Sequence, residues 1–395
     1  MLGAVAARLP YQRADMHPNH LAIALVLGLA PTSALGAPPA CAQDPALEPS
    51  TNAKIPAAAW TQEVFTLKSK QLGEEIRVFV GKPPTFSQSQ RKLPALYLLD
   101  GQYYFTKILS VLTALEADGQ VPEMLLIGIE SRDRRVDFTP PEIDLPDVGG
   151  RARAKTYLDF LEHELIPAAE SRLRADKPRI LMGHSHGAML AIYAVSERPK
   201  LFPWVIALDP PVHHEHGFLG NALQRALARA DRPPVRVVSR KVVFGWSVEQ
   251  WAQLQRAAKA KDLLRDGAIA GESHESMLFP ASYQALQEIF LDSSALRTRD
   301  LTPLEIDELY RGLAECYGAE ITPPEPAMRR IIEDFLLEGR GSHAATWLDR
   351  YVATYGKPND LDELASRVKA AAALGDPNET VAGLLALPRA TPPLR

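Results

Sequence analysis

Apolar residues recur between positions 61 and 291 with two spacings, one typical of strands and one typical of helices. Two segments alternate apolar and polar residues on either side of Gly73-Glu74, which predicts an antiparallel pair at a sheet edge. Other runs are almost wholly apolar, as in strands buried on both faces of a parallel sheet. The expected strands are 63–67, 75–80, 94–99, 124–129, 179–182, 204–208, 235–244 and 268–270.

Between these strands, apolar residues three and four positions apart predict helices. They are expected at 104–117, 157–166, 248–264 and 281–291, with another after residue 187. Residues 131–150 form a long connection, and loops of that length in compact domains are usually functional or mobile. Strands that alternate with helices predict an α/β fold over residues 61–292, a doubly wound and mostly parallel sheet with reactive groups at the strand ends.

After Asp292 the strand pattern ends. From residue 303 onward the chain holds only helical patterns broken by Pro and Gly, so we expect a small all-α domain at 303–390. Leu337-Glu338-Gly339 and Leu374-Gly375 stand at like points of two helix pairs, which loosely resembles tetratricopeptide repeats. A plain helical cap packed on the sheet domain explains the pattern equally well.

The N-terminal region carries a short apolar run, Leu21–Ala30, followed by small residues. The run is too short to span a bilayer, and with Ala40-Cys41-Ala42 it predicts a secretory signal peptide at 1–42. A periplasmic or secreted location follows from that prediction, and residues 43–60 would form a linker rich in Pro and Ala. An unstructured N-terminal tail is the alternative.

The overall composition is that of a globular protein, since 46% of the 395 residues are hydrophobic and 23% are charged. The net charge of −4 provides no broad basic face, so nucleic acid is not an expected partner, and no membrane span is expected. Cleavage after Ala42 leaves Cys316 as the single cysteine, which excludes an internal disulfide. Met1 and Met16 are both candidate starts, because only the longer form places arginines before the apolar run.

The clearest chemical signal is Gly183-His184-Ser185-His186-Gly187, which follows an apolar run and precedes a helical pattern. This order predicts a nucleophile elbow, in which a strand, a tight turn and a helix expose the serine hydroxyl. The helix that begins near His186 directs its free N–H groups toward that hydroxyl, where a negative oxygen would develop. An ordinary glycine-rich turn is the alternative.

A serine hydroxyl needs a base, and in this fold the partners follow in the order Ser, acid, His. His274, just past the last expected strand, is the predicted base, unless it is only a loop histidine bonded to a carbonyl. Glu249 is the first candidate for the acid, although an acidic residue in a first helical turn can also serve as a cap. Asp209, after the preceding strand, is the second candidate, and a site with no discrete acid is the third.

Two backbone N–H groups are predicted to stabilise the oxyanion. One belongs to His186, the residue after the nucleophile, and the other comes from the turn after the third strand, where Gln102 is preferred. The Asp100-Gly101 sequence in that turn also fits a tight turn with no catalytic role.

Five histidines gather near the expected strand ends, at positions 184, 186, 213, 214 and 216. Their spacing matches no known ligand set, so we expect no metal, and no other cofactor is implied. Instead His184 and His213, with Arg132 and Arg135 of the long loop, are candidate contacts for a phenolic or anionic substrate.

The LYLLDGQYYF segment, the RDRRVDFTP loop, the GHSHG elbow and the GESHES segment together resemble the putative esterase family, which includes S-formylglutathione hydrolase and the enterochelin and ferric-siderophore esterases. The resemblance covers about residues 61–291 and implies a cofactor-free serine esterase of α/β-hydrolase fold. It implies Ser185 as nucleophile, His274 as base, oxyanion donors at Gln102 and His186, and basic substrate contacts in the 132–135 loop. The chain departs from the family at His186, where many relatives have leucine, and at Asp209-Pro210-Pro211, where they more often have a Ser-Pro-Ser-like turn.

We therefore expect an exported serine carboxylic-ester hydrolase that works through an acyl-enzyme on Ser185 and acts on a siderophore or another small-molecule ester. An acyltransferase with the same acyl-enzyme is one alternative. A catalytically silent hydrolase-like binding protein, with a protein partner on its C-terminal helices, is the other.

Overall fold

The computed structural model describes residues 60–290 except 89, residues 322–374 except 358–360, and a few positions between 305 and 315. The predicted signal peptide, nearly all of the 43–60 linker, Cys316 and the side chains of residues 215 and 216 lie outside the described residues. No helix of the described part is both long enough and apolar enough to cross a membrane.

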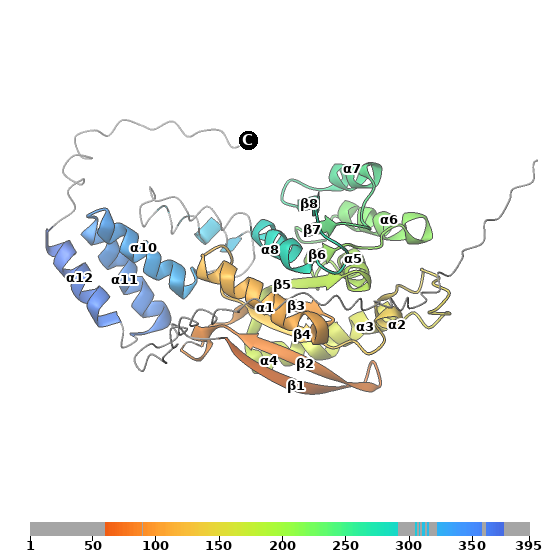
Figure 1. The fold of residues 1–395 in the computed structure, drawn as a ribbon, viewed down its shortest axis with the longest axis horizontal. Coiled ribbons are helices and arrows are strands. Elements are labelled where there is room, and N and C mark those ends of the chain that lie inside the picture. The colour runs from red at the N-terminus through yellow and green to blue at the C-terminus, as the bar shows by residue number, and fades with distance from the viewer. Residues whose placement is uncertain are drawn as a thin grey trace, which may run out of the picture. The chain divides into compact units, whose positions relative to one another are not determined.

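Eight strands form one sheet in the order β1-β2-β4-β3-β5-β6-β7-β8 (Figure 1). The predicted antiparallel pair, β1 with β2, lies at one edge, and β2 is also antiparallel to β4, whereas all the other neighbours are parallel. The strands are β1 (Thr61–Ser69), β2 (Glu74–Lys82), β3 (Leu93–Leu99), β4 (Leu125–Ile129), β5 (Ala175–His184), β6 (Trp204–Leu208), β7 (Arg236–Lys241) and β8 (Leu263–Ala268). The predicted mostly parallel α/β sheet is confirmed.

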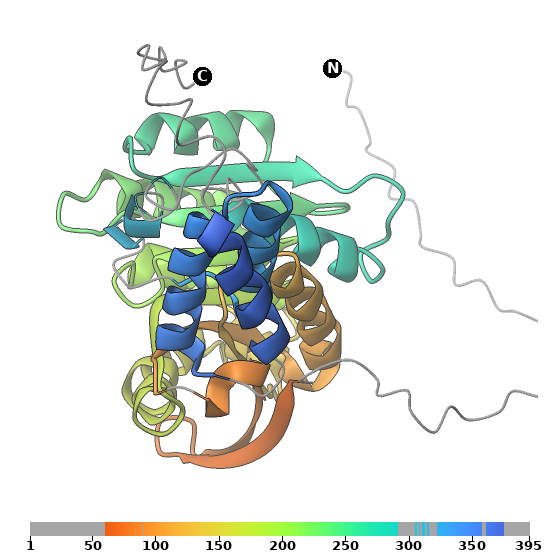
Figure 2. The same ribbon diagram turned by 90° about the vertical axis from the view of Figure 1, so that its left-hand side faces the viewer.

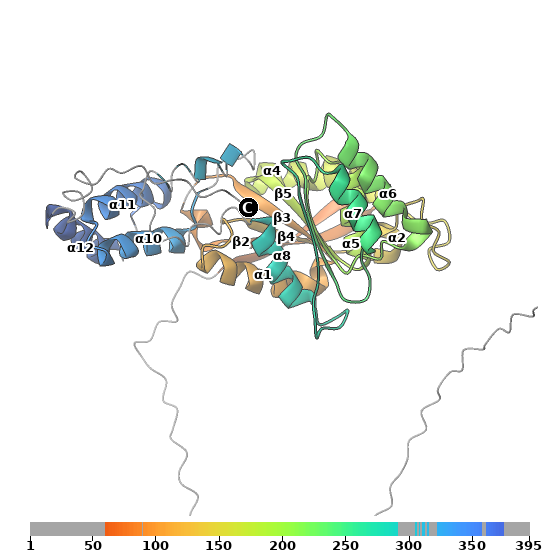
Figure 3. The same ribbon diagram turned by 90° about the horizontal axis from the view of Figure 1, so that it is seen from above.

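Helices cover both faces of this sheet. One face packs against α1 (Gly101–Ala117) and α8 (Leu278–Ile289). The other face packs against α3 (Ala154–Phe160), a π-helical turn (Leu161–Leu165), α4 (Ile166–Leu173), α5 (His186–Glu197), α6 (His214–Ala228) and α7 (Val248–Ala257). Figure 3 shows α1 and α4 on opposite sides of the strands.

The central strand β3 explains how the sheet joins two cores. All of its residues are buried, as its continuous apolar run predicts. Because successive residues of a strand face opposite ways, Tyr97 and Leu99 join the cluster that contains α5, whereas Leu96 and Leu98 join the cluster that contains α1. The carboxyl end of β3 is therefore fixed from both sides.

The described part of the C-terminal region is helical, as predicted. It consists of α10 (Glu325–Leu337), α11 (Gly341–Tyr355) and α12 (Leu361–Leu374), which Figure 2 shows in blue, side by side. Arg330 donates hydrogen bonds to the carbonyls of Ala117 and Asp118 at the end of α1, at 2.7 and 3.3 Å. The helices thus pack beside α1, and both the tetratricopeptide-like and the plain-cap interpretations stay predictions.

The helices α6 and α7 differ from the sequence pattern. The pattern predicts one helix over 248–264, but α7 ends at Ala257 and β8 begins at Leu263. The Asp262 carboxylate accepts hydrogen bonds from the backbone N–H groups of Lys259 and Val235, which makes a turn and places Leu263 beside β7. The helix α6 was not predicted, because its first residues are histidines and glycine, which are weak helix formers.

The two glycines of the elbow are not equivalent. A Cβ at Gly183 would lie 2.2 Å from the backbone of Gly187, far inside any real contact, so β5 and α5 can approach each other only with glycine there. A Cβ at Gly187 would meet Asp100 and Leu99 at 3.4 Å, which is close to ordinary contact. The sharpness of the elbow therefore depends on Gly183.

We expect Gly183→Ala to lower the free energy of unfolding by about 2–3 kcal/mol, because the added methyl group pushes backbone against backbone. Urea unfolding followed by circular dichroism measures this change. Gly220→Ala is the matched control, since its Cβ would meet the Trp246 ring at 3.4 Å and alanine favours the helix. Equal losses in the two variants would contradict the explanation.

Candidate active site

Ser185 occupies the turn between β5 and α5. Its backbone angles, φ 58° and ψ −119°, are rare for a residue with a side chain and indicate local strain. Two hydrogen bonds hold the turn, from the Ser185 N–H to the Leu208 carbonyl at 2.8 Å and from the Met189 N–H to the Ser185 carbonyl at 3.0 Å. Among the described residues, the Ser185 hydroxyl has no hydrogen-bond partner, so it is free to meet a base or a substrate.

Backbone strain gathers around this serine. In the described part of the chain, four residues other than glycine have a positive φ, and three of them are Asp100, Ser185 and Asp209. They directly follow β3, β5 and β6, three neighbouring parallel strands. Unusual backbone conformations that cluster at strand ends are typical of functional sites.

His274 lies in the loop between β8 and α8 and points one ring nitrogen at a carboxylate. Its Nδ1 is 2.6 Å from Oδ2 of Asp209, and its side chain is 23% exposed. Its other nitrogen, Nε2, has no hydrogen bond to any residue that the structure describes. A histidine held at Nδ1 with Nε2 free has the arrangement of a base that accepts a proton from a hydroxyl.

Asp209 is fixed by backbone N–H groups. It is fully buried, and Oδ1 accepts hydrogen bonds from Val242, Val243 and Phe244 at 2.7, 3.0 and 2.8 Å. These three residues directly follow β7, the strand next to the one that Asp209 follows. Successive backbone N–H groups that converge on one oxygen stabilise a negative charge.

The structure pairs His274 with Asp209, not with Glu249, the carboxylate preferred from the sequence. Glu249 is exposed in the first turn of α7, and it forms no hydrogen bond with His274. Ser247 and Gln250 form a capping box at the start of that helix. Glu249 therefore fits the alternative role of an acidic residue in a first helical turn, and the carboxylate beside His274 is that of Asp209.

The two predicted oxyanion donors stand in the first turns of α1 and α5. The N–H groups of Gln102 and His186 make no hydrogen bonds within the described residues, as expected for the start of a helix. The two helices follow β3 and β5, which are adjacent in the sheet. The structure thus leaves both N–H groups unbonded at the starts of helices that follow neighbouring strands, and their role in catalysis stays a prediction.

Asp100 is more than part of a tight turn. Its buried carboxylate accepts hydrogen bonds from Nε and Nη2 of Arg134, at 3.1 and 3.0 Å, and from the Ser131 hydroxyl. Arg134, in the short helix α2 (Arg134–Phe138), also donates to the carbonyl of His184 at 3.1 Å. Burial raises the pKa of Asp100, and the Arg134 charge opposes that rise. This support for the elbow is not predicted from the sequence, where its one signal is Asp100, an acidic residue at the end of an apolar strand.

His184 offers no free polar atom to a substrate, contrary to the sequence prediction. It is only 5% exposed, and both ring nitrogens have protein partners. Nε2 is 2.7 Å from the carbonyl oxygen of His274, and Nδ1 is 3.1 Å from the hydroxyl of Tyr104. A histidine with both nitrogens bonded inside the protein has no donor or acceptor left for a ligand.

The other predicted substrate contacts lie at the surface. Arg132 is 3.8 Å from Glu74, and Arg135 pairs with Asp147. The exposed His213 stacks on Phe244 at 5.6 Å, and the Phe244 ring meets His274 edge-on at 5.5 Å. His213 is therefore joined to the site through an aromatic ring, and substrate contacts by these three side chains stay predictions.

His186 carries an uncharged ring. Burial, followed by the charges of Arg134 and Arg135, lowers its pKa to about 4. Both of its ring nitrogens are inaccessible to solvent and have no hydrogen-bond partner among the described residues. Leaving polar atoms buried and unpaired costs folding free energy.

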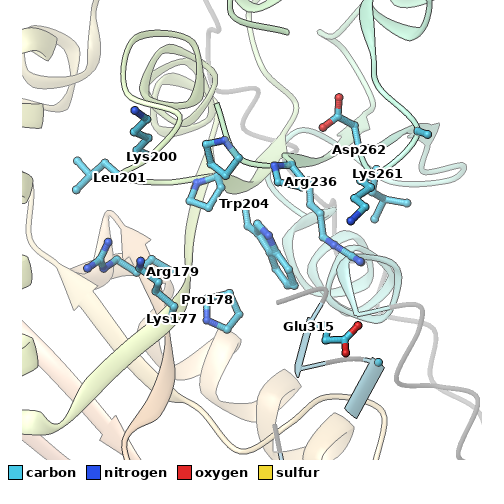
Figure 4. A pocket seen from close by; sticks show the side chains of 16 residues that line it. Lys177, Pro178, Arg179, Lys200, Leu201, Trp204, Arg236, Lys261, Asp262 and Glu315 are labelled. Atoms are coloured by element: carbon cyan, nitrogen blue, oxygen red, sulfur yellow. The ribbon is translucent and has the colours of Figure 1, made fainter. Parts of the chain in front are cut away.

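The described residues contain no group of three His, Cys, Asp or Glu side chains that could hold a metal ion. A cavity of about 730 Å³ lies at the amino ends of strands β5, β6 and β7, the ends opposite to those that carry the predicted site residues. Figure 4 shows Trp204, Arg236 and Lys261 in its wall. None of the predicted site residues lines it, so the candidate active site is elsewhere, at the carboxyl ends of the strands.

A sheet of this strand order, with a serine elbow after β5 and a histidine after β8, defines an α/β-hydrolase. Residues 69–272, just over half of the chain, match the family model described as "Putative esterase", and the chain belongs to this family.

Several curated proteins are similar in sequence. The uncharacterised protein YbbA of Bacillus subtilis is 30% identical over 30% of the chain and 50% of its own length. The ferri-bacillibactin esterase BesA of the same organism is 24% identical over 53% of the chain and 78% of its own length. The siderophore triacetylfusarinine C esterase of Aspergillus fumigatus is 30% identical over 38% of the chain and 56% of its own length. The chain thus spans about half the length of two of these relatives.

Solved structures share the fold. An IroE-like serine hydrolase from Shewanella oneidensis superposes with a TM-score of 0.63 at 23% identity, over 74% of the chain and all of that protein. An uncharacterised protein from Capnocytophaga ochracea gives a TM-score of 0.55 at 16% identity, over 79% of the chain and 93% of that protein.

The low pKa of His186 makes stability depend on pH. The pKa of His186 is about 4 in the folded protein and near 6.5 in the unfolded chain. Between these two pH values the unfolded chain binds a proton that the folded protein does not bind. The free energy of unfolding is therefore fully present above pH 6.5 and falls as the pH is lowered toward 4. We expect His186→Leu to flatten this fall by up to about 1.4 kcal/mol per pH unit. Urea unfolding at a series of pH values measures it, and His163→Leu, at an exposed position, should change nothing. An unchanged slope in His186→Leu would contradict the explanation.

Proposed function

We propose that this protein is a serine carboxylic-ester hydrolase in which Ser185 is the nucleophile, His274 the base and Asp209 the residue that orients the base. The observation that carries the proposal is the 2.6 Å contact between His274 Nδ1 and Asp209, which leaves Nε2 as the only nitrogen available to a hydroxyl. Membership of the esterase family and the free Ser185 hydroxyl support the same chemistry.

In the proposed reaction, Ser185 Oγ attacks the ester carbonyl carbon while its proton passes to His274 Nε2. The N–H groups of Gln102 and His186 stabilise the negative carbonyl oxygen. The bond to the leaving oxygen then breaks, and that oxygen takes the proton from His274, which releases the alcohol. Water gives a proton to His274 and attacks the acyl group, so the carboxylic acid leaves and the serine recovers its proton.

For the substrate, we infer a siderophore ester or a similar ester with aromatic groups. Two of the similar curated proteins are named as siderophore esterases. The rings of His213, Phe244 and His274 lie in succession, and His213 is exposed, which suits stacking with an aromatic acyl group. Export to the periplasm or the medium is part of this proposal and rests on the sequence pattern of residues 1–42.

A fluorophosphonate probe tests the nucleophile without knowledge of the substrate, because it reacts with activated serines. We expect the wild-type protein to be labelled at one site and Ser185→Ala to remain unlabelled. Tryptic mass spectrometry should place the label on the elbow peptide. A wild-type protein that resists labelling would favour the binding-protein alternative.

The choice of acid is tested by two isosteric substitutions. Asp209→Asn should lower kcat for p-nitrophenyl acetate about 10⁴-fold, because the amide no longer stabilises the imidazolium on His274. Glu249→Gln should keep kcat within about twofold, since Glu249 is exposed and away from His274. A larger loss of kcat in Glu249→Gln than in Asp209→Asn would identify Glu249 as the acid.

The substrate class is tested by comparing kcat/KM for a tricatecholate trilactone with that for p-nitrophenyl acetate. We expect a preference of about tenfold or more for the lactone, and Phe244→Ala should lower kcat/KM for the lactone more than kcat/KM for the small ester. Equal kcat/KM values for the two esters would reject the siderophore assignment while leaving the esterase intact.

A further inference from the structure

The loop that carries His274 has few attachments to the rest of the molecule. Residues 270–276 form turns between β8 and α8. Within the part of the chain that the structure describes, two hydrogen bonds connect this loop to the sheet, one from His274 Nδ1 to Asp209 and one from the His274 carbonyl to His184. The bonds of Ser273 and Ser276 stay inside the loop or reach only Met277. The imidazole is therefore held by one side-chain hydrogen bond, one backbone hydrogen bond and its ring contacts with His184 and Phe244.

The backbone contact fixes the tautomer of His184. A carbonyl oxygen can only accept a hydrogen bond, so Nε2 of His184 carries the ring proton. It donates a hydrogen bond of 2.7 Å to the backbone carbonyl of His274. Nδ1 is then an acceptor, and the hydroxyl of Tyr104, 3.1 Å away, donates to it. Tyr104 stands in α1, so these bonds link α1, the end of β5 and the His274 loop.

Ring contacts reinforce the hydrogen bonds. The His184 and His274 rings lie 4.4 Å apart at an angle of 38°, and the Tyr104 ring meets His184 edge-on at 5.6 Å. Burial, followed by the nearby His274, lowers the pKa of His184 to about 4. A neutral ring is the form that does not repel the positive charge that His274 acquires during the reaction.

We propose that His184 and Tyr104 are positioning residues, in which the Tyr104 hydroxyl orients His184 and His184 holds the backbone of His274 so that Nε2 faces Ser185. This inference rests on the proposed function, because it concerns the geometry of the base. It gives the elbow a second role, since the residue before the nucleophile also anchors the base.

The test compares two substitutions of His184 in the full chain. His184→Leu removes the donor, whereas His184→Gln retains an N–H at a similar reach. With p-nitrophenyl acetate, His184→Leu should lower kcat about 10- to 100-fold with KM within about twofold, because the base is misplaced and no substrate contact is lost. His184→Gln should recover about tenfold of that loss. A raised KM with unchanged kcat, or equal losses in both variants, would overturn the proposal.

A second pair tests the tyrosine. Tyr104→Phe should lower kcat about two- to fivefold, because Nδ1 of His184 loses its donor. Tyr103→Phe is the matched control, since Tyr103 is exposed and its hydroxyl has no bond to His184. Should His184→Leu fail to fold, this pair decides the matter, and equal kcat values for the two tyrosine variants would overturn the proposal.

Labelling by a fluorophosphonate separates this inference from the proposed function. A wild-type protein that is not labelled contradicts the proposed nucleophile. A wild-type protein that is labelled, together with His184→Leu labelled at the same rate, leaves the esterase standing and rejects the positioning role. Slower labelling of His184→Leu, with partial recovery in His184→Gln, supports the proposal.

Discussion

Three backbone N–H groups that converge on the Asp209 carboxylate are the constraint on which the site depends. They belong to the segment that leaves β7, so the pairing of β6 with β7 sets where the carboxylate points. Asp209 in turn sets the direction of His274 through a single short contact. A loop histidine thus acquires a fixed direction from the sheet, although its own loop contains no regular structure.

An ion pair supports the elbow, and two uncharged rings flank the nucleophile in sequence. Arg134 bridges the buried Asp100 carboxylate and the His184 carbonyl, so the ion pair reaches the strand end. Burial is the main cause that lowers the pKa of both His184 and His186 to about 4. The two rings next to the nucleophile in sequence therefore stay uncharged at neutral pH.

Patterns of apolar residues predicted the sheet, the edge hairpin and the elbow, because each depends on local spacing and on glycine. The choice between Asp209 and Glu249 could not be made in that way, since both follow a strand and both lie between Ser185 and His274 in sequence. What separates them is a set of N–H groups more than thirty residues from Asp209, visible only after β6 and β7 pair. The prediction of His184 as a substrate contact was wrong for a similar reason, because its partners Tyr104 and His274 lie 80 and 90 residues away in sequence.

The end of α1 that faces away from the site also matters. Met328, Ile332 and Phe335 of α10 belong to the same apolar cluster as Ile108 and Leu112 of α1, and Ala327 lies close to Gly119. A shortened chain that stopped after α8 would leave this apolar surface open to water, which favours aggregation. The solubility of the hydrolase domain thus depends on the C-terminal helices, which cover this apolar surface.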